Sequence, residues 1–157
     1  MTIVFKACLA VAAMLPAWAR ASPDLSVSGV FHAGWLDVTV PRLGGGSFTA
    51  KLFYPATSSG QNTPYDGTGA PYPGISFGHG FLQTVEKYQL TLEHLATWGY
   101  FVIASRSGGE LFPNHQAFAN DLRHCLTYLE QGNLDNGSWL YGQVPVSYTH
   151  LRAHETP

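Results

Sequence analysis

The feature that most constrains this 157-residue chain is a short apolar segment that stops abruptly at Gly78-His79-Gly80. The segment covers residues 72–77 and is broken by Pro73 near its start, a pattern that predicts a short buried strand. Glycine gives the backbone access to positive φ, so the strand can end in a sharp turn. Such a turn can point backbone N–H groups at a developing negative charge.

The residues before this segment predict an antiparallel hairpin. Weakly alternating apolar residues indicate strands over 27–41 and 47–54, and three consecutive glycines at 44–46 supply the turn. These glycines do not indicate a phosphate site, because no helix-opening Lys-Ser or Lys-Thr follows them. We expect Pro55 to end the second strand and residues 56–70 to form a polar surface loop.

The residues after the segment predict a βαβ unit and a further helix. A helix is expected over 85–98, with Thr84 as its N-cap and Gly99 as its stop, followed by an apolar strand over 100–104. Because the two strands flank one helix, they should run parallel. A second helix should begin at Asn114 or His115 and end near Glu130. The apolar stripes of the two helices are Tyr88, Leu92, Leu95 and Ala96, then Phe118, Leu122, Cys125, Leu126 and Leu129.

One serine lies in a context close to a nucleophile motif. Ser107 stands in Ser-Arg-Ser-Gly-Gly, the nearest match here to G-x-S-x-G. A nucleophile elbow needs a helix directly after the serine, whereas Gly108, Gly109 and Pro113 delay the next helix. Ser107 is therefore interpreted as a residue of the loop that rims a site, not as the attacking group.

Other polar side chains are interpreted as structural. Asp121 and His124 can touch at i, i+3 on a helix, but the expected arrangement is a solvated pair off the apolar stripe. His94 is expected on a wet helix face. His150 and His154 are four residues apart, but no Glu follows His150, so the pair does not match a metal site and no metal is expected.

Composition and the N-terminal residues limit the partners and the cellular compartment expected for the protein. The chain is 45% hydrophobic and 11% charged, with a formal net charge of −2 and no Lys/Arg cluster, which argues against nucleic acid and anionic membranes as partners. Lys6, an apolar run over 7–19 and Ala19-Arg20-Ala21 predict a signal peptide over residues 1–21, cleaved near Ala21. The run is too short for a stable membrane span, although an uncleaved anchor is the alternative. The mature protein should then be secreted or periplasmic.

Export leaves one cysteine in the mature chain. Cys125 has no partner for an internal disulfide, so it is either a buried apolar thiol or pairs outside this chain.

The order of these motifs resembles the first half of an α/β-hydrolase. The resemblance is carried by Ser-Phe-Gly-His-Gly-Phe at 76–81, by Leu-Ala-Thr-Trp-Gly-Tyr at 95–100 and by Phe-Val-Ile-Ala at 101–104, and it spans roughly residues 38–144. It is similar to the lipase-like group that contains chlorophyllases, platelet-activating-factor acetylhydrolases and cutinase-like polyesterases. The resemblance implies an α/β fold in which the N-terminal hairpin leads into a parallel sheet with flanking helices.

The same resemblance assigns roles to the loop. The backbone N–H of Phe81 would be one oxyanion donor, His79 and Gly80 would shape the loop, and Leu82 and Phe112 would wall the substrate pocket. The family pattern continues with a G-x-S-x-G elbow, but residues 146–157 read Val-Ser-Tyr-Thr-His-Leu-Arg-Ala-His-Glu-Thr-Pro instead. This run resembles translated sequencing-adapter read-through. We therefore expect residues 22–145 to be the N-terminal half of a hydrolase domain and the tail from about Val146 to be non-native, with a divergent C-terminus as the alternative.

The expected function is that of a secreted serine carboxylic-ester hydrolase acting on a small-molecule or polymeric ester, without a cofactor. The serine, aspartate and histidine of such an enzyme cannot be assigned in this chain, so the literal fragment is expected to be inactive. Two alternatives stay open. One is an inactive hydrolase-like fragment or binding module, and the other is a dienelactone hydrolase-like enzyme with a cysteine nucleophile, or a peptidase, on the same fold.

Overall fold

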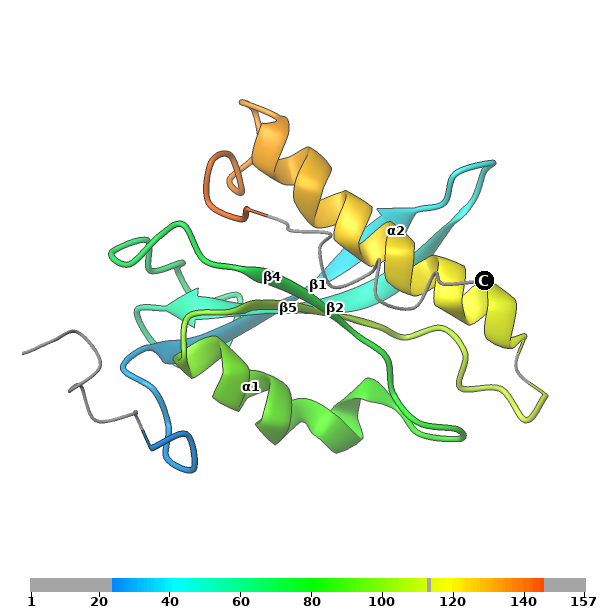
Figure 1. Cartoon of the computed structure of the whole chain (residues 1–157), viewed down its shortest axis with the longest axis horizontal. Coiled ribbons are helices and arrows are strands. Elements are labelled where there is room, and N and C mark those ends of the chain that lie inside the picture. The colour runs from blue at the N-terminus through cyan, green and yellow to red at the C-terminus, as the bar shows by residue number, and fades with distance from the viewer. Residues whose placement is uncertain (1–23, 113, 146–157) are drawn as a thin grey trace, which may run out of the picture.

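The computed structural model describes residues 24–112 and 114–145. The predicted signal peptide over residues 1–21 and the predicted non-native tail, with His150 and His154, lie outside these residues. Five strands form one mixed sheet in the order β3-β1-β2-β5-β4, and α1 and α2 lie on opposite faces of it (Figure 1). The fold is therefore of the α/β class. In chain order the elements are β1 (His32–Pro41), β2 (Ser47–Ala56), β3 (Gly60–Gln61), β4 (Gly74–Phe77), the 3-10 helix η2 (Val85–Tyr88), α1 (Gln89–Thr97), β5 (Phe101–Ser105) and α2 (His115–Leu134).

The N-terminal hairpin is confirmed, but its strands are bounded differently from the prediction. β1 and β2 pair antiparallel from His32 opposite Ala56 to Pro41 opposite Ser47, so the first strand begins later than residue 27. The prediction that Pro55 ends the second strand is wrong. The carbonyl of Pro55 accepts the N–H of Asp66, and in an extended strand the N and C=O of one residue face the same side. The missing N–H of Pro55 therefore faces the loop at Asp66 and costs the β1–β2 ladder nothing.

The predicted βαβ unit is present. β4 and β5 pair parallel, from Gly74 opposite Phe101 to Phe77 opposite Ala104, and α1 connects them. The other edge of β5 pairs antiparallel with β2, so β5 lies between two strands that precede it in the chain. All five residues of β5 are buried, as the apolar pattern predicted for a strand covered on both faces.

The first predicted helix is divided into two parts. Residues 85–88 form the 3-10 helix η2, and α1 begins only at Gln89. Thr84 occupies the predicted N-cap position, now of η2, but its side chain makes no capping hydrogen bond. Gly99 does end the helix, with φ +87° and its N–H bonded to the carbonyl of Ala96.

The second helix is longer than predicted. Asn114 caps it through a 3.0 Å bond that its side chain accepts from the N–H of Ala117. The helix runs four residues past Glu130, through Gly132. A Cβ at Gly132 would lie 2.8 Å from a methyl carbon of Leu140, so this glycine lets the following turn pack directly on the helix.

Each face of the sheet buries its own apolar layer. Alternation along β5 sends Phe101 and Ile103 to the α2 side, and Val102 and Ala104 to the α1 side. The two-residue strand β3 was not predicted, because two residues carry no periodic signal; it pairs parallel with β1. The α2 side also holds Val38, Val40, Phe48, Ala50, Leu52, Tyr54, Cys125, Leu129, Leu140 and Val144, and the α1 side also holds Phe53, Val85, Leu92 and Ala96.

Within residues 24–112 and 114–145, neither helix combines the length and the hydrophobicity that crossing a bilayer requires.

Candidate functional site

The candidate site lies where β4 and β5 end. These strands are parallel, so their carboxyl ends meet at one edge of the sheet, the position where open α/β sheets commonly bind ligands. The loop over 78–84 leaves β4 there, and the loop over 106–114 leaves β5. The two loops are in contact, because a Cβ at Gly109 would lie 3.6 Å from the carbonyl oxygen of Gln83.

The first loop contains a tight turn whose two central N–H groups, those of Phe81 and Leu82, make no hydrogen bond to any described residue. The carbonyl of Gly80 accepts the N–H of Gln83 at 3.0 Å, and Leu82 has φ +55°, which is the pattern of a type II turn. The N–H of Phe81 makes no hydrogen bond within the part of the chain that the structure describes, and Phe81 is 59% exposed. Leucine at positive φ is strained, since glycine or asparagine normally occupies this place in a turn.

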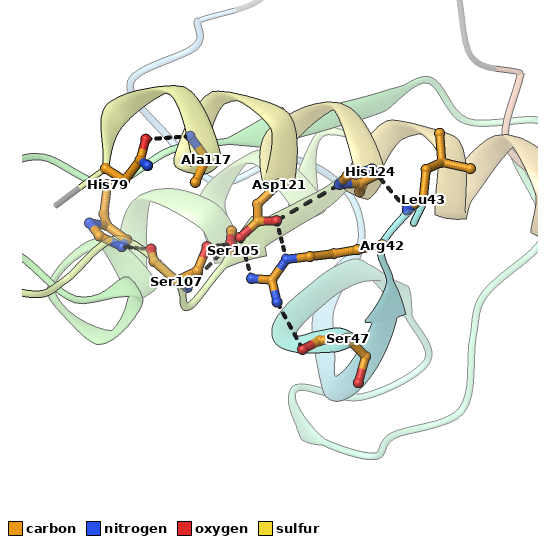
Figure 2. Close-up of polar contacts among 10 residues, drawn as sticks. Arg42, Leu43, Ser47, His79, Ser105, Ser107, Ala117, Asp121 and His124 are labelled. Carbon is orange, nitrogen blue, oxygen red and sulfur yellow. Dashed lines mark hydrogen bonds and ion pairs between the residues drawn. The ribbon is translucent and has the colours of Figure 1, made fainter. Parts of the chain in front are cut away.

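His79 joins the two loops. Its ring is 7% exposed, with Nδ1 3.0 Å from the carbonyl oxygen of Gly80 and Nε2 2.8 Å from that of Ser107 (Figure 2). The ring centroid lies 5.0 Å from that of Phe118 on α2. Because both ring nitrogens face backbone carbonyls, His79 holds the loops together.

Two glycines let α2 approach the loops closely. A Cβ at Gly78 would lie 2.9 Å from a methyl carbon of Leu122. A Cβ at Gly108 would lie 2.6 Å from the Phe118 ring, and Gly108 also has φ +82°. The first half of α2 therefore packs directly on the backbone of both loops.

Ser107 has no base in this arrangement. Its Oγ lies 2.7 Å from the Oγ of Ser105, and its N–H donates to that same oxygen at 3.2 Å. A side-chain hydrogen bond from Ser107 also lowers the pKa of Asp121. Among the described residues no imidazole nitrogen contacts the Ser107 hydroxyl, because His79 reaches only the backbone carbonyl. The hydroxyl is thus tied into a structural network.

Asp121 is more buried than the sequence predicted and has a different partner. It was expected in a solvated pair with His124, but it is only 3% exposed and lies on the buried face of α2. Arg42 donates to both of its carboxylate oxygens at 2.7 Å, whereas the nearest His124 nitrogen is 3.8 Å away (Figure 2). Burial on its own raises the pKa of this carboxyl, but the hydrogen bonds from Arg42 and Ser107 outweigh it, and the pKa lies below its usual value.

His124 is fixed from the hairpin turn. Its Nε2 accepts the backbone N–H of Leu43 at 3.2 Å, so the proton of the neutral ring is on Nδ1. Nδ1 is buried and has no hydrogen-bond partner among the described residues. His94 is partly exposed on α1, and its Nε2 lies 2.9 Å from the carbonyl oxygen of Leu25.

The sequence analysis did not predict the network of charged side chains at the end of the 78–84 loop. Lys51 of β2 is 3% exposed, and its ammonium lies 4.0 Å from the centroid of the Trp35 ring and 3.8 Å from Glu86. Glu86, in η2, also pairs with Arg106 at 3.1 Å. These contacts anchor the end of the 78–84 loop to the sheet. Lys51 alternates with apolar residues in a strand, which normally indicates a solvated face, so the pattern concealed its burial.

The two predicted pocket residues are exposed. Leu82 is 48% exposed and Phe112 is 90% exposed, on the two neighbouring loops. Phe81 and Leu111 are exposed as well, at 59% and 64%. These four residues form an exposed apolar rim on the two loops, not the wall of an enclosed cavity.

Within residues 24–112 and 114–145, no group of three or more His, Cys, Asp or Glu side chains is placed to hold a metal ion.

No protein-family model matches the chain, and no curated protein matches it. Among solved structures, it is similar to the crystal structure of a hypothetical protein from Pseudomonas aeruginosa, with 16% sequence identity and a TM-score of 0.48. The match covers 81% of this chain and 39% of that one, so this chain spans about two fifths of that protein's length.

Proposed function

We propose that residues 22–145 are the N-terminal half of an exported serine carboxylic-ester hydrolase with an α/β-hydrolase fold. In this proposal the N–H of Phe81 is one of two donors that stabilise the oxyanion. The observation that carries the proposal is that this N–H is free, at the carboxyl end of β4, between two loops that His79 holds together. A donor fixed before the reaction stabilises developing charge without a reorganisation cost.

The strained backbone of this turn also supports a functional role for the loop. The turn puts Leu82 at φ +55°, although a glycine there would remove the strain. Strained backbone conformations concentrate at functional sites, where the surrounding structure maintains them. Here the contacts of His79, and the 3.3 Å bond from the N–H of Gly80 to the hydroxyl of Tyr88, maintain the turn.

The chemistry would be nucleophilic catalysis. A serine hydroxyl attacks the ester carbonyl, a tetrahedral intermediate forms, and its collapse expels the alcohol and leaves an acyl-enzyme that water hydrolyses. Phe81 would supply one N–H to the intermediate, typically worth about 3 kcal/mol, and the residue after the serine would supply the second. The apolar rim of Leu82 and Phe112 suits a small-molecule or polymeric ester with an acyl or aromatic group.

The nucleophile, acid and base belong, in this proposal, to residues that follow Val144 in the source protein. β4 is a terminal strand of the described sheet, so its outer edge is open to one more strand. Sequencing the source gene past the codon for Val144 tests the assignment directly. A strand followed by G-x-S-x-G supports it, G-x-C-x-G replaces it with a dienelactone hydrolase-like enzyme, and neither motif refutes it.

The role of Phe81 is tested in the complete protein with p-nitrophenyl butyrate. Phe81→Pro removes the N–H, and proline is favoured at the second position of a type II turn, so the fold should be kept. Phe81→Ala removes the ring and keeps the N–H. We expect Phe81→Pro to lower kcat about 100- to 1,000-fold relative to Phe81→Ala. Equal activity of the two variants would refute a donor role for this N–H.

A further inference from the structure

A cavity of about 340 Å³ opens far from the loops described above. Phe118 in the first turn of α2 lies against His79, with ring centroids 5.0 Å apart. The cavity is bordered by Trp139, whose ring centroid lies 5.8 Å from that of Phe101 at the start of β5, whereas the loops described above follow the ends of β4 and β5. The volume falls in the range of small-molecule sites. The lining residues are Leu36, Tyr54, Asn62, Thr63, Tyr65 and Trp139.

Three aromatic rings form the wall. The ring of Trp139 is inclined by 65° to that of Tyr54 and by 62° to that of Tyr65, with centroids 5.4 Å and 5.7 Å apart. The tyrosine hydroxyls are already used, since Tyr54 donates to the carbonyl of Thr63 and Tyr65 donates to the side chain of Gln143. The rings are thus fixed in position, yet Trp139 is still 43% exposed.

Asn62 supplies a polar group beside the rings. Its backbone has φ +56°, and its N–H donates to the carbonyl of Trp35 at 2.7 Å, directly after the pairing of β3 with β1. Asparagine tolerates this conformation better than most residues. The side-chain amide makes no hydrogen bond to any described residue, so one acceptor and two donors are available.

We propose that this cavity binds a pyranose unit of a neutral oligosaccharide. None of the six lining side chains is charged, which favours a neutral ligand. The C–H face of a pyranose suits the electron-rich face of Trp139, and its hydroxyls suit the carboxamide of Asn62. The cavity is open on one side, so the neighbouring sugar units can extend into solvent. This site is separate from the proposed ester chemistry and does not depend on it.

Isothermal titration of the full 157-residue chain tests the proposal. The probes are cellohexaose, xylohexaose and mannohexaose, with tetramethylammonium and p-cresol as rival ligands. We expect saturable binding of at least one hexasaccharide. Trp139→Ala should weaken that binding at least tenfold and Asn62→Gly, which keeps the positive φ, three- to tenfold. Tyr141→Ala is the matched control and should change the affinity less than twofold, because Tyr141 is an exposed aromatic residue that does not line the cavity.

Thermal melting of each variant, followed by circular dichroism, separates lost binding from lost folding. Trp139→Phe keeps an aromatic surface and should bind within about threefold of the parent chain, which tests the site even where Trp139→Ala unfolds. The proposal is overturned if no hexasaccharide binds, or if binding is unchanged in both Trp139→Ala and Asn62→Gly. It is also overturned if only tetramethylammonium or p-cresol binds in a manner that depends on Trp139.

Discussion

Arg42 holds both carboxylate oxygens of Asp121 at 2.7 Å, although 79 positions separate the two residues in the chain. The pair joins the turn of the N-terminal hairpin to the middle of α2, over an otherwise apolar layer. Two parallel hydrogen bonds between charged groups fix orientation as well as distance. This contact therefore fixes the position of the hairpin turn relative to α2.

The first prediction concerns the stability that depends on Asp121. Asp121→Ala should lower the free energy of unfolding by about 2–3 kcal/mol, less than for a fully buried pair because Arg42 is 37% exposed and can rehydrate. Urea unfolding followed by circular dichroism measures the change. Asp37→Ala is the control: Asp37 pairs with Arg106 but is 43% exposed, so the loss there should stay below about 1 kcal/mol. Equal losses of unfolding free energy in the two variants would show that the contact between Arg42 and Asp121 stabilises the fold no more than an exposed ion pair does.

The second prediction is the pH dependence of the same contact. The pKa of Asp121 is lower in the folded protein than its ordinary 3.8, so the folded state favours the ionised carboxylate. Its contribution is complete above pH 3.8 and is lost as the pH falls through the lower folded value. The stability advantage of the parent chain over Asp121→Asn should therefore shrink below pH 3.8. An advantage that persists undiminished at pH 2 would contradict this account.

The third prediction concerns the glycine under Phe118. Gly108→Ala introduces both an unfavourable φ of +82° and a Cβ 2.6 Å from the Phe118 ring. Gly45→Ala introduces an unfavourable φ of +111° in open space, because nothing lies within 4 Å of its Cβ position. Gly108→Ala should thus cost about 1–3 kcal/mol more than Gly45→Ala in thermal or urea unfolding. Similar costs would mean that α2 moves away freely.

The fourth prediction concerns the strained turn. Leu82→Gly relieves the positive φ, worth about 1–2 kcal/mol, against a loss of about 0.5–1 kcal/mol in backbone entropy. We expect the variant to be as stable as the parent or slightly more stable. Leu90→Gly is the matched control, since Leu90 is 82% exposed near the start of α1 and should lose about 1 kcal/mol. If both substitutions destabilise equally, the turn is not strained.

The fifth prediction concerns Cys125. Burial raises the pKa of its thiol to about 12, above the ordinary 9.0, so the folded protein should react with iodoacetamide at pH 8 only through unfolding. Labelling rates, read by mass spectrometry, should rise with urea in parallel with the unfolded fraction. Because the folded pKa is raised, the thiol's contribution is complete below pH 9 and declines as the pH rises toward 12. Rapid labelling in buffer would place the thiol at the surface.

Periodic patterns predicted the elements well and their ends poorly. The stripe that predicted α2 ends at Leu129, but the helix continues through Gly132 because Leu140 packs where a side chain would project. Likewise Pro55 belongs to β2, since the side of the strand that lacks an N–H faces a loop. Both outcomes depend on contacts with distant residues, which local patterns do not carry.

The polar side chains were harder to place than the apolar ones. Asp121 and Lys51 are each 3% exposed, although the sequence pattern around each residue predicts a solvent-exposed side chain. Each is paired across the fold, with Arg42 and with Glu86 respectively.

The glycines around His79 indicated a turn near Phe81, and a turn is present. However, neither Gly78 nor Gly80 has a positive φ, and this conformation falls on Leu82 instead. The aromatic cavity was not predicted, because its lining residues come from four separate segments and share no spacing.

The position of β5 has a consequence for synthesis. The ribosome makes β2 and β4 before the strand that lies between them, so neither strand has its central partner until Ser105 has been added. Up to that moment the nascent chain carries two unpaired edges, and such edges invite pairing with other chains. Translational pausing before β5 has emerged from the ribosome would prolong this exposure.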